Sequence, residues 1–172
     1  MKTTKPTYYK LTDHNGQTRG PTQWGENITH KAVGSSDRLC TESWIHFYRD
    51  PILAVLMNPI HARFSNPRLW EGFVPEGEEL HEPLKSGSRI FTTTREITLP
   101  RITRTQRTIF GILCAKVMYH DSAWNTWADN YISGKDRSPA SAAAAAYAAA
   151  YAASAAEDTN FIELAHKALT YD

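Results

Sequence analysis

An alanine-rich segment, residues 140–156, limits what this chain can fold into more than any other feature of its sequence. Thirteen of its 17 residues are Ala, and the remaining four are Ser141, Tyr147, Tyr151 and Ser154. Ala has the highest intrinsic helix propensity, so this segment can be helical with little help from tertiary contacts. We therefore predict a helix that begins at Ser138-Pro139 and carries Tyr147 and Tyr151 on one face, four residues apart.

The small side chains of this predicted helix let another backbone approach closely. The helix is expected either to pack tightly on its own domain or to offer a flat surface to a partner, and the sequence leaves both open. A second copy of the chain as that partner would make a homo-oligomer. Tyr147 and Tyr151 are then predicted contact residues. A membrane-spanning helix is not predicted, because Ala is nearly neutral for insertion into lipid and the segment has no Leu or Ile.

The composition indicates a folded chain with a modest core. Leu, Ile, Val and Phe make up only 32 of the 172 residues, but the net charge of +1 disfavours disorder. Five Trp and eight Tyr add large side chains to bury. The N-terminus has no apolar signal peptide, and Cys40 and Cys114, 74 positions apart, fit no disulfide framework and no metal-ligand spacing. We expect reduced thiols and a cytoplasmic protein.

The N-terminal two-thirds of the chain has the pattern of short, mainly antiparallel strands. Runs rich in β-branched and aromatic residues predict strands over residues 7–12, 27–33, 43–48, 69–74 and 87–99. A tight turn is predicted at residues 13–16, which contain Asn-Gly. Asp50-Pro51 starts a helix of about two turns, which Asn58-Pro59 is expected to close, because the residue before proline avoids the helical conformation.

The last third of the chain changes to helical spacing. Thr103 and Gln106 fit a capping box, and Asp121 can cap a second helix. One face of that second helix carries the residues Trp124, Trp127, Ala128 and Tyr131. Gly134 is expected to end it, and a last short helix is predicted over residues 161–169.

Strands followed by helices predict an α+β fold, with short, mainly antiparallel strands first and a helical C-terminal part that includes the Ala-rich helix. We expect a single α+β domain over residues 1–137. Residues 138–172 are expected to form the Ala-rich helix and the short terminal helix, packed on that domain or on a partner.

Charge is distributed unevenly along the chain. Residues 85–107 hold six basic side chains and one acidic one, whereas residues 71–82 hold five acidic side chains and no Lys or Arg. Arg101, Arg104 and Arg107 stand three residues apart where a helix is expected to begin, and a helix N-terminus beside arginines can hold phosphate. These three are predicted binding residues, and the segment from Lys85 to Arg107 is a predicted contact for nucleic-acid phosphate. Alternatively, the two segments neutralise each other across neighbouring strands or are simply solvated.

Motifs for catalysis and cofactor binding are missing from the sequence. The seven histidines are scattered singly, and no HExxH, CxxC, GxGxxG, Walker or GxSxG pattern occurs. We predict no metal site and no cofactor. If the chain is an enzyme, we expect a nucleotide-using type such as an ADP-ribosyltransferase, whose cleft would draw on Tyr8, Tyr9, His30, His46, Glu71 and Glu96.

Four stretches of the chain resemble a known group of sequences. They are Leu39–Tyr48 (LCTESWIHFY), Asp50–Ala62 (DPILAVLMNPIHA), Asn66–Glu71 (NPRLWE) and Arg95–Pro100 (REITLP). They are similar to an uncharacterised family of small proteins from tailed phages and prophages, some of which also end in Ala/Tyr-rich tracts. The similarity covers about residues 7–133. It implies a phage or prophage source, but no activity, cofactor or catalytic residue.

These observations predict a phage-encoded accessory protein in the cytoplasm of an infected bacterium. The absent catalytic motifs, the aromatic residues and the split charge favour direct binding to a host protein or nucleoprotein complex. An anti-CRISPR or other anti-defence inhibitor would act in this way. An enzyme is the first alternative and a virion component the second. No membrane partner is expected.

Overall fold

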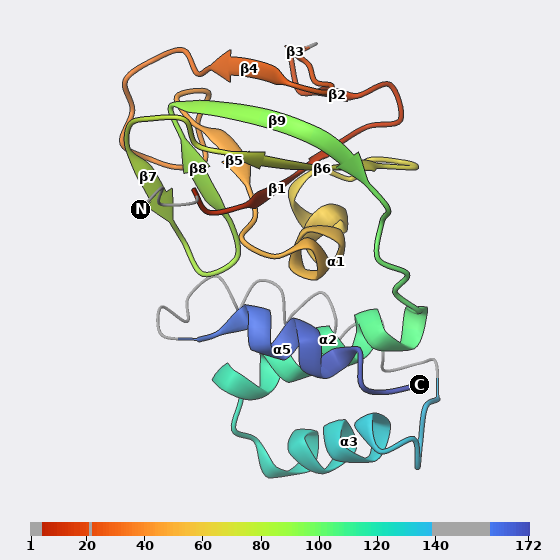
Figure 1. Ribbon diagram of the computed structural model, residues 1–172. Helices are drawn as coiled ribbons and strands as arrows, with labels where there is room; N and C mark the ends of the chain where they lie inside the picture. The colour runs from red at the N-terminus through yellow and green to blue at the C-terminus, as the bar shows by residue number, and fades with distance from the viewer. Residues whose placement is uncertain (1–4, 21, 139–158) are drawn as a thin grey trace. The chain divides into compact units, whose positions relative to one another are not determined.

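The computed structural model of the chain describes residues 5–20, 22–138 and 159–172, and divides into two compact units after Pro100 (Figure 1). The predicted Ala-rich helix, with Tyr147 and Tyr151, lies outside the described residues. The predicted boundary at residue 137 therefore stays a prediction. The fold class is confirmed as α+β, with short antiparallel strands in the N-terminal part and helices after them.

The N-terminal unit is built from short strands and one helix. Its elements are β1 (Tyr8–Thr12), β2 (Gln17–Thr18), β3 (Thr22–Gln23), β4 (Ile28–Lys31), β5 (Ile45–Phe47), α1 (Pro51–His61), β6 (Arg68–Phe73), β7 (Glu79–His81), β8 (Ser86–Ser88) and β9 (Ile90–Ile97).

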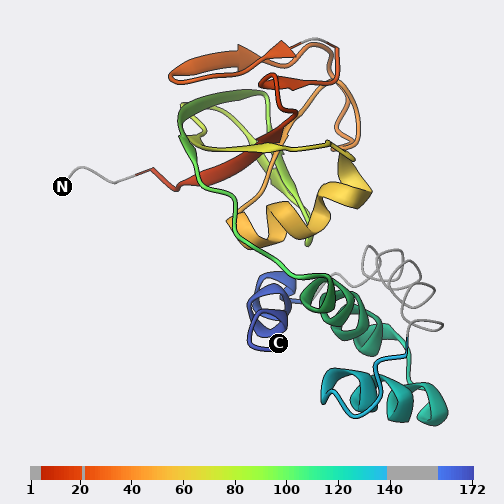
Figure 2. The same ribbon diagram turned by 90° about the vertical axis from the view of Figure 1, so that its right-hand side faces the viewer.

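These strands form a four-stranded sheet in the order β1-β6-β9-β4, a three-stranded sheet in the order β5-β8-β7 and the hairpin β2-β3, all with antiparallel pairing. Only Arg89 separates β8 from β9, so one stretch of chain passes from one sheet to the other. A bridge between Tyr9 and Tyr48 links β1 to the end of β5. Helix α1 packs against β1 (Figures 1 and 2).

Aromatic residues from both sheets make the core of this unit. Phe47 and Phe91 are fully buried and stack with ring centroids 4.8 Å apart, and Tyr8 lies 4.5 Å from Phe47. Trp24 and Val74 complete the cluster, together with Ile45. Aromatic side chains of this size bury enough area to stabilise a unit with few Leu, Ile and Val residues.

The predicted strands over residues 7–12, 27–33, 43–48 and 69–74 are confirmed as β1, β4, β5 and β6. The predicted strand over 87–99 is present as β9, with β8 split from it at Arg89. The predicted turn is confirmed, and its Gly16 has a φ of 79°, a left-handed conformation that favours glycine.

The prediction that Asn58-Pro59 closes α1 is wrong. The helix continues through Pro59 to His61. Asn58 explains where it ends, because its side chain bonds both backbone groups of Phe64, at 3.0 and 3.1 Å. The predicted start is confirmed, since the Asp50 carboxylate accepts hydrogen bonds from the backbone N–H groups of Ile52 and Leu53.

The described part of the C-terminal unit consists of α2 (Arg104–Met118), α3 (Ser122–Ile132) and α5 (Phe161–Ala168). The predicted caps are confirmed: Thr103 and Gln106 form a complete capping box, and the Asp121 side chain accepts from the backbone N–H of Trp124. Helices α2 and α5 lie side by side (Figures 1 and 2). Across residues 5–20, 22–138 and 159–172, no helix has the length and apolarity needed to cross a membrane.

Candidate functional site

A row of aromatic rings runs from the end of α2 along α3. The ring centroids of Tyr119 and Trp124 are 5.4 Å apart, those of Trp124 and Trp127 are 6.0 Å apart, and those of Trp127 and Tyr131 are 5.8 Å apart. We call these four residues the aromatic row. It begins at the surface, where Tyr119 is 53% exposed, passes through two half-buried Trp side chains and ends at the buried Tyr131. Met118, 43% exposed, extends its outer end.

The chain around the outer end of the aromatic row is held in place by polar contacts. Lys116 of α2 forms an ion pair with Asp129 of α3 at 2.5 Å. The Asn125 side chain donates to the backbone carbonyls of Asp121 (2.9 Å) and Tyr119 (3.4 Å). These contacts fix the turn between α2 and α3, so Tyr119 and Trp124 are ordered before any partner arrives, which lowers the entropic cost of binding.

The three predicted binding arginines differ in how far they are available. Arg101 and Arg104 are exposed at the start of α2, and their guanidinium groups make no hydrogen bond or ion pair within the described residues. Arg107 is half-buried, and burial lowers the pKa of its guanidinium. Two of the three can therefore meet an anionic partner without first leaving contacts inside the protein.

Most of the remaining basic segment is engaged within the N-terminal unit. Arg95 makes two hydrogen bonds to the Glu71 carboxylate, at 2.7 and 2.9 Å. Arg89 donates to the backbone carbonyl of Ser43 at 2.7 Å and lies over the ring of Trp44. Among the described residues, the acidic and basic segments are joined by the single ion pair Glu71–Arg95 across β6 and β9, so their mutual neutralisation is observed at this one position.

The histidines and carboxylates suggested for a nucleotide-using enzyme take part in separate interactions and do not form one site. Glu96 forms an ion pair with Arg68, as Glu71 does with Arg95. His30 bonds the carbonyl of Gln23 and His46 that of Leu39. Within the described residues, no hydrogen bond or ion pair joins either histidine to either carboxylate. The four residues lie on four different strands, β4, β5, β6 and β9.

A serine, a histidine and a carboxylate do meet on the β7–β8 hairpin. Ser86 Oγ lies 2.8 Å from His81 Nδ1, and His81 Nε2 lies 3.4 Å from a Glu79 oxygen, which also accepts from the Tyr8 hydroxyl at 2.5 Å. Burial, and then the bond to Glu79, raises the pKa of Tyr8 to about 12. A nucleophile, a base and an orienting acid have this order in hydrolases. Ser86 is completely buried, however, so no substrate reaches its hydroxyl and the network serves to hold the hairpin.

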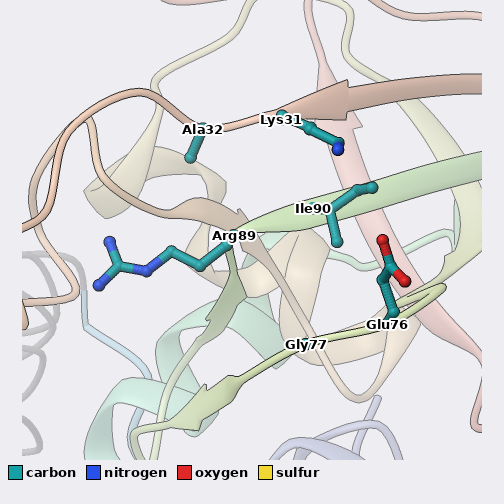
Figure 3. Close-up of a pocket in the computed structure, with 6 residues that line it drawn as sticks. All are labelled: Lys31, Ala32, Glu76, Gly77, Arg89 and Ile90. Atoms are coloured by element: carbon teal, nitrogen blue, oxygen red, sulfur yellow. The ribbon is translucent and has the colours of Figure 1, made fainter.

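A cavity of about 410 Å³ opens on the N-terminal unit, between the end of β4 and the loop that precedes β7 (Figure 3). Lys31 and Glu76 extend into it from opposite walls over Ile90, whereas Arg89 extends away. One ammonium and one carboxylate on an open apolar floor provide no catalytic pair. Among the described residues, no group of three or more His, Cys, Asp or Glu is arranged to hold a metal ion.

Three basic groups of the N-terminal unit are shielded from water, since Lys10 is buried and His46 and His61 are half-buried. Burial lowers the pKa of Lys10 to about 7. It also lowers the pKa of His46, and that of His61 to about 4, with further lowering by Lys85. The His61 ring stacks on Tyr48, and its Nδ1 lies 3.1 Å from the Tyr48 hydroxyl. These groups are neutral in the folded protein over pH ranges in which they would be charged in the unfolded chain.

Acid is therefore expected to destabilise the N-terminal unit through His61. Because its folded pKa lies below its unfolded value, the unfolded chain binds more protons between pH 6.5 and 4, and stability is lost as the pH falls through that range. We expect a loss of roughly 2 kcal/mol from this group between pH 6.5 and 4.5. The variant His61→Gln lacks this titrating group. Urea titrations should therefore show that its free energy of unfolding falls by roughly 2 kcal/mol less between pH 6.5 and 4.5 than that of the wild type. An equal acid loss in both proteins would contradict this assignment.

Sequence reasoning anticipated the helical face that carries Trp124 and Trp127 but not its exposure. The signal available was Met118-Tyr119-His120, an apolar and aromatic pair beside a histidine immediately after a helix end.

Compared with known proteins, the chain matches no family model, no curated protein sequence and no solved structure. The function must therefore be argued from the residues themselves.

Proposed function

We propose that this chain is a phage-encoded accessory protein that acts by binding a host protein, alone or within a nucleoprotein complex, and that the aromatic row is its main contact. The observation that carries the proposal is the half-exposed Tyr119–Trp124–Trp127 stretch with Met118 beside it. Trp and Tyr are among the residue types that dominate binding energy at protein interfaces, and Met is enriched there. The resemblance to proteins of tailed phages and prophages supports an infected bacterium as the place of action, with anti-CRISPR or other anti-defence inhibition as the expected outcome.

Arg101 and Arg104 belong to the same proposal as charged contacts. Both lie in the C-terminal unit, at the other end of α2 from Tyr119. Exposed arginines steer a partner of opposite charge and fix its orientation. Arg107 and, outside the described residues, Tyr147 and Tyr151 remain predicted contact residues.

Affinity capture from infected bacteria tests the proposal. We expect the tagged chain to retain a host protein, and a Met118→Ser/Tyr119→Ser variant to retain at least about tenfold less, because truncating interface anchors costs about 1–2 kcal/mol or more. Arg101→Glu/Arg104→Glu should weaken capture and remove part of its salt dependence.

Matched controls on the N-terminal unit separate these effects from general losses of apolar surface or charge. Val33→Ser/Ile60→Ser removes two side chains that are 66% and 47% exposed, close to the exposure of the tested pair. Arg19→Glu/Arg38→Glu makes the same change of charge at two exposed arginines. Equal capture by the Met118→Ser/Tyr119→Ser variant and its control would count against the proposal.

A further inference from the structure

An exposed cysteine and a lysine that are 45 residues apart in the sequence meet on the N-terminal unit. Lys85 Nζ lies 2.5 Å from Cys40 Sγ. Cys40 stands in the loop between β4 and β5, and Lys85 in the turn between β7 and β8, which the bond from Glu82 N to Lys85 O closes at 2.9 Å. Cys40 is exposed, whereas Cys114 is buried.

Contacts of the neighbouring residues hold the backbone beside Cys40 and the backbone beside Lys85. Leu39, next to Cys40, is 2% exposed and packs on Gly87 of β8, two residues after Lys85. The approach is so close that a Cβ at Gly87 would lie 2.5 Å from Leu39 Cδ1. The carbonyl of Leu39 is bonded by the His46 ring and by the backbone N–H of Thr41. The backbone beside each member of this exposed pair is therefore anchored by packed neighbours.

Lys85 also acts electrostatically on two histidines of the same unit. Besides burial, Lys85 and Lys10 lower the pKa of His46, and Lys85 and His46 lower that of His61. No carboxylate contributes to either shift. A thiol that solvent reaches and an amine held against its sulfur supply what the chemistry proposed below needs, which is access for an oxidant and a nucleophile in reach of the oxidised sulfur.

We propose that Cys40 and Lys85 are an oxidation-sensitive pair that hydrogen peroxide converts into a covalent sulfur–nitrogen cross-link. Peroxide first transfers one oxygen atom to Cys40 sulfur and leaves as water, so the sulfur loses two electrons and becomes a sulfenic acid. Cys40 reacts as its thiolate, so the proton that the Lys85 ammonium gives up is the one that completes the sulfenic acid, and the neutral amine then attacks that sulfur. The S–OH bond breaks as the S–N bond forms, and the departing hydroxide takes a proton from the amine to become a second water molecule. This modification is independent of the binding function proposed above.

Mass spectrometry of the full chain in a Cys114→Ala background tests the cross-link, because that background excludes an internal disulfide of the same mass. After stoichiometric peroxide we expect a monomer lighter by about 2 Da, restored by dithiothreitol, with Cys40 and Lys85 joined in one peptide pair. Lys85→Arg keeps the positive charge but removes the attacking amine. In that variant Cys40 should still react, giving products heavier by about 16 or 32 Da, and no cross-link.

Three results would overturn the proposal. The first is a Lys85→Arg variant that gives the same lighter product. The second is a wild-type Cys40 that stays unmodified while a short unfolded peptide with the same cysteine reacts. The third is a product heavier by about 14 Da, which would place an oxygen between the two side chains in place of the direct bond. Circular dichroism of each variant before oxidation confirms that the fold is intact.

Discussion

Replacing Lys10 with Met is expected to stabilise the N-terminal unit below neutral pH and to flatten its pH dependence. Lys10 is only 5% exposed. Its ammonium donates to the carbonyl of His46 at 2.9 Å and lies 4.5 Å from the centre of the Trp24 ring, and it forms no ion pair with any described residue. A buried charge without a counter-ion is unfavourable, which is why burial lowers the pKa of this amine to about 7.

The sign of the effect follows from the two protonation states. Above pH 7 the folded protein releases the Lys10 proton, whereas the unfolded chain keeps it up to about pH 10.4. The wild type should therefore gain up to about 1.4 kcal/mol of stability per pH unit between pH 7 and 9. Lys10→Met has no proton to release, so it should lack this gain and be roughly 2–4 kcal/mol more stable than the wild type at pH 6.

Native-state hydrogen exchange of the β1 and β6 amides at pH 6 to 9, checked by urea titration, measures this directly for the N-terminal unit. Lys31→Met is the matched control, because Lys31 is exposed on β4, and it should follow the wild-type profile. Parallel pH profiles for Lys10→Met and the wild type would show that the Lys10 amine stays charged in the fold.

Gly72→Ala is expected to lower the free energy of unfolding of the same unit by about 3 kcal/mol. Gly72 lies where the register between β6 and β9 shifts, a β-bulge. A Cβ there would lie 2.3 Å from the backbone oxygen of Thr92 and 2.6 Å from the Phe91 ring. Phe91 cannot withdraw, because it is fully buried and stacked on Phe47. The added methyl group must therefore push two paired strands apart.

Gly25→Ala is the matched control for this prediction, because its new Cβ would meet only Ile28, at 3.5 Å. It should change the stability by no more than about 0.5 kcal/mol. The double variant Gly72→Ala/Phe91→Leu should recover part of the loss, since the smaller side chain makes room for the methyl group. Urea titrations in which Gly72→Ala and Gly25→Ala are equally stable would contradict the close packing described at the bulge.

The helix starts were predictable from the sequence because their causes are local. Thr103 with Gln106, and Asp121, each bond a backbone N–H within three residues, so the residue type and spacing are enough. Strands β2, β3 and β7 were not predicted, since each has only two or three residues and exists through its pairing partner. Helix α1 runs past Pro59 to His61, and at its end the Asn58 side chain bonds the backbone of Phe64, a contact that no helix propensity describes.

The candidate sites divide in the same way, into features that local sequence predicts and features that depend on tertiary contacts. The face that carries Trp124 and Trp127 could be read from helical spacing, but its exposure depends on what packs against α3. The approach of Lys85 to Cys40 depends on the turn between β7 and β8 meeting the loop between β4 and β5, and no local pattern encodes it. The neutralisation of Glu71 by Arg95 required the register of β6 on β9, which the charge pattern allowed but did not determine.

Hydrogen–deuterium exchange of the chain in its captured complex tests the binding function most directly. If the aromatic row is the main contact, amides from Lys116 to Ile132 should exchange more slowly in the complex than in the free chain, and the Met118→Ser/Tyr119→Ser variant should lose that protection. Slower exchange confined to residues 5–100, with residues 116–132 unchanged, would contradict the account.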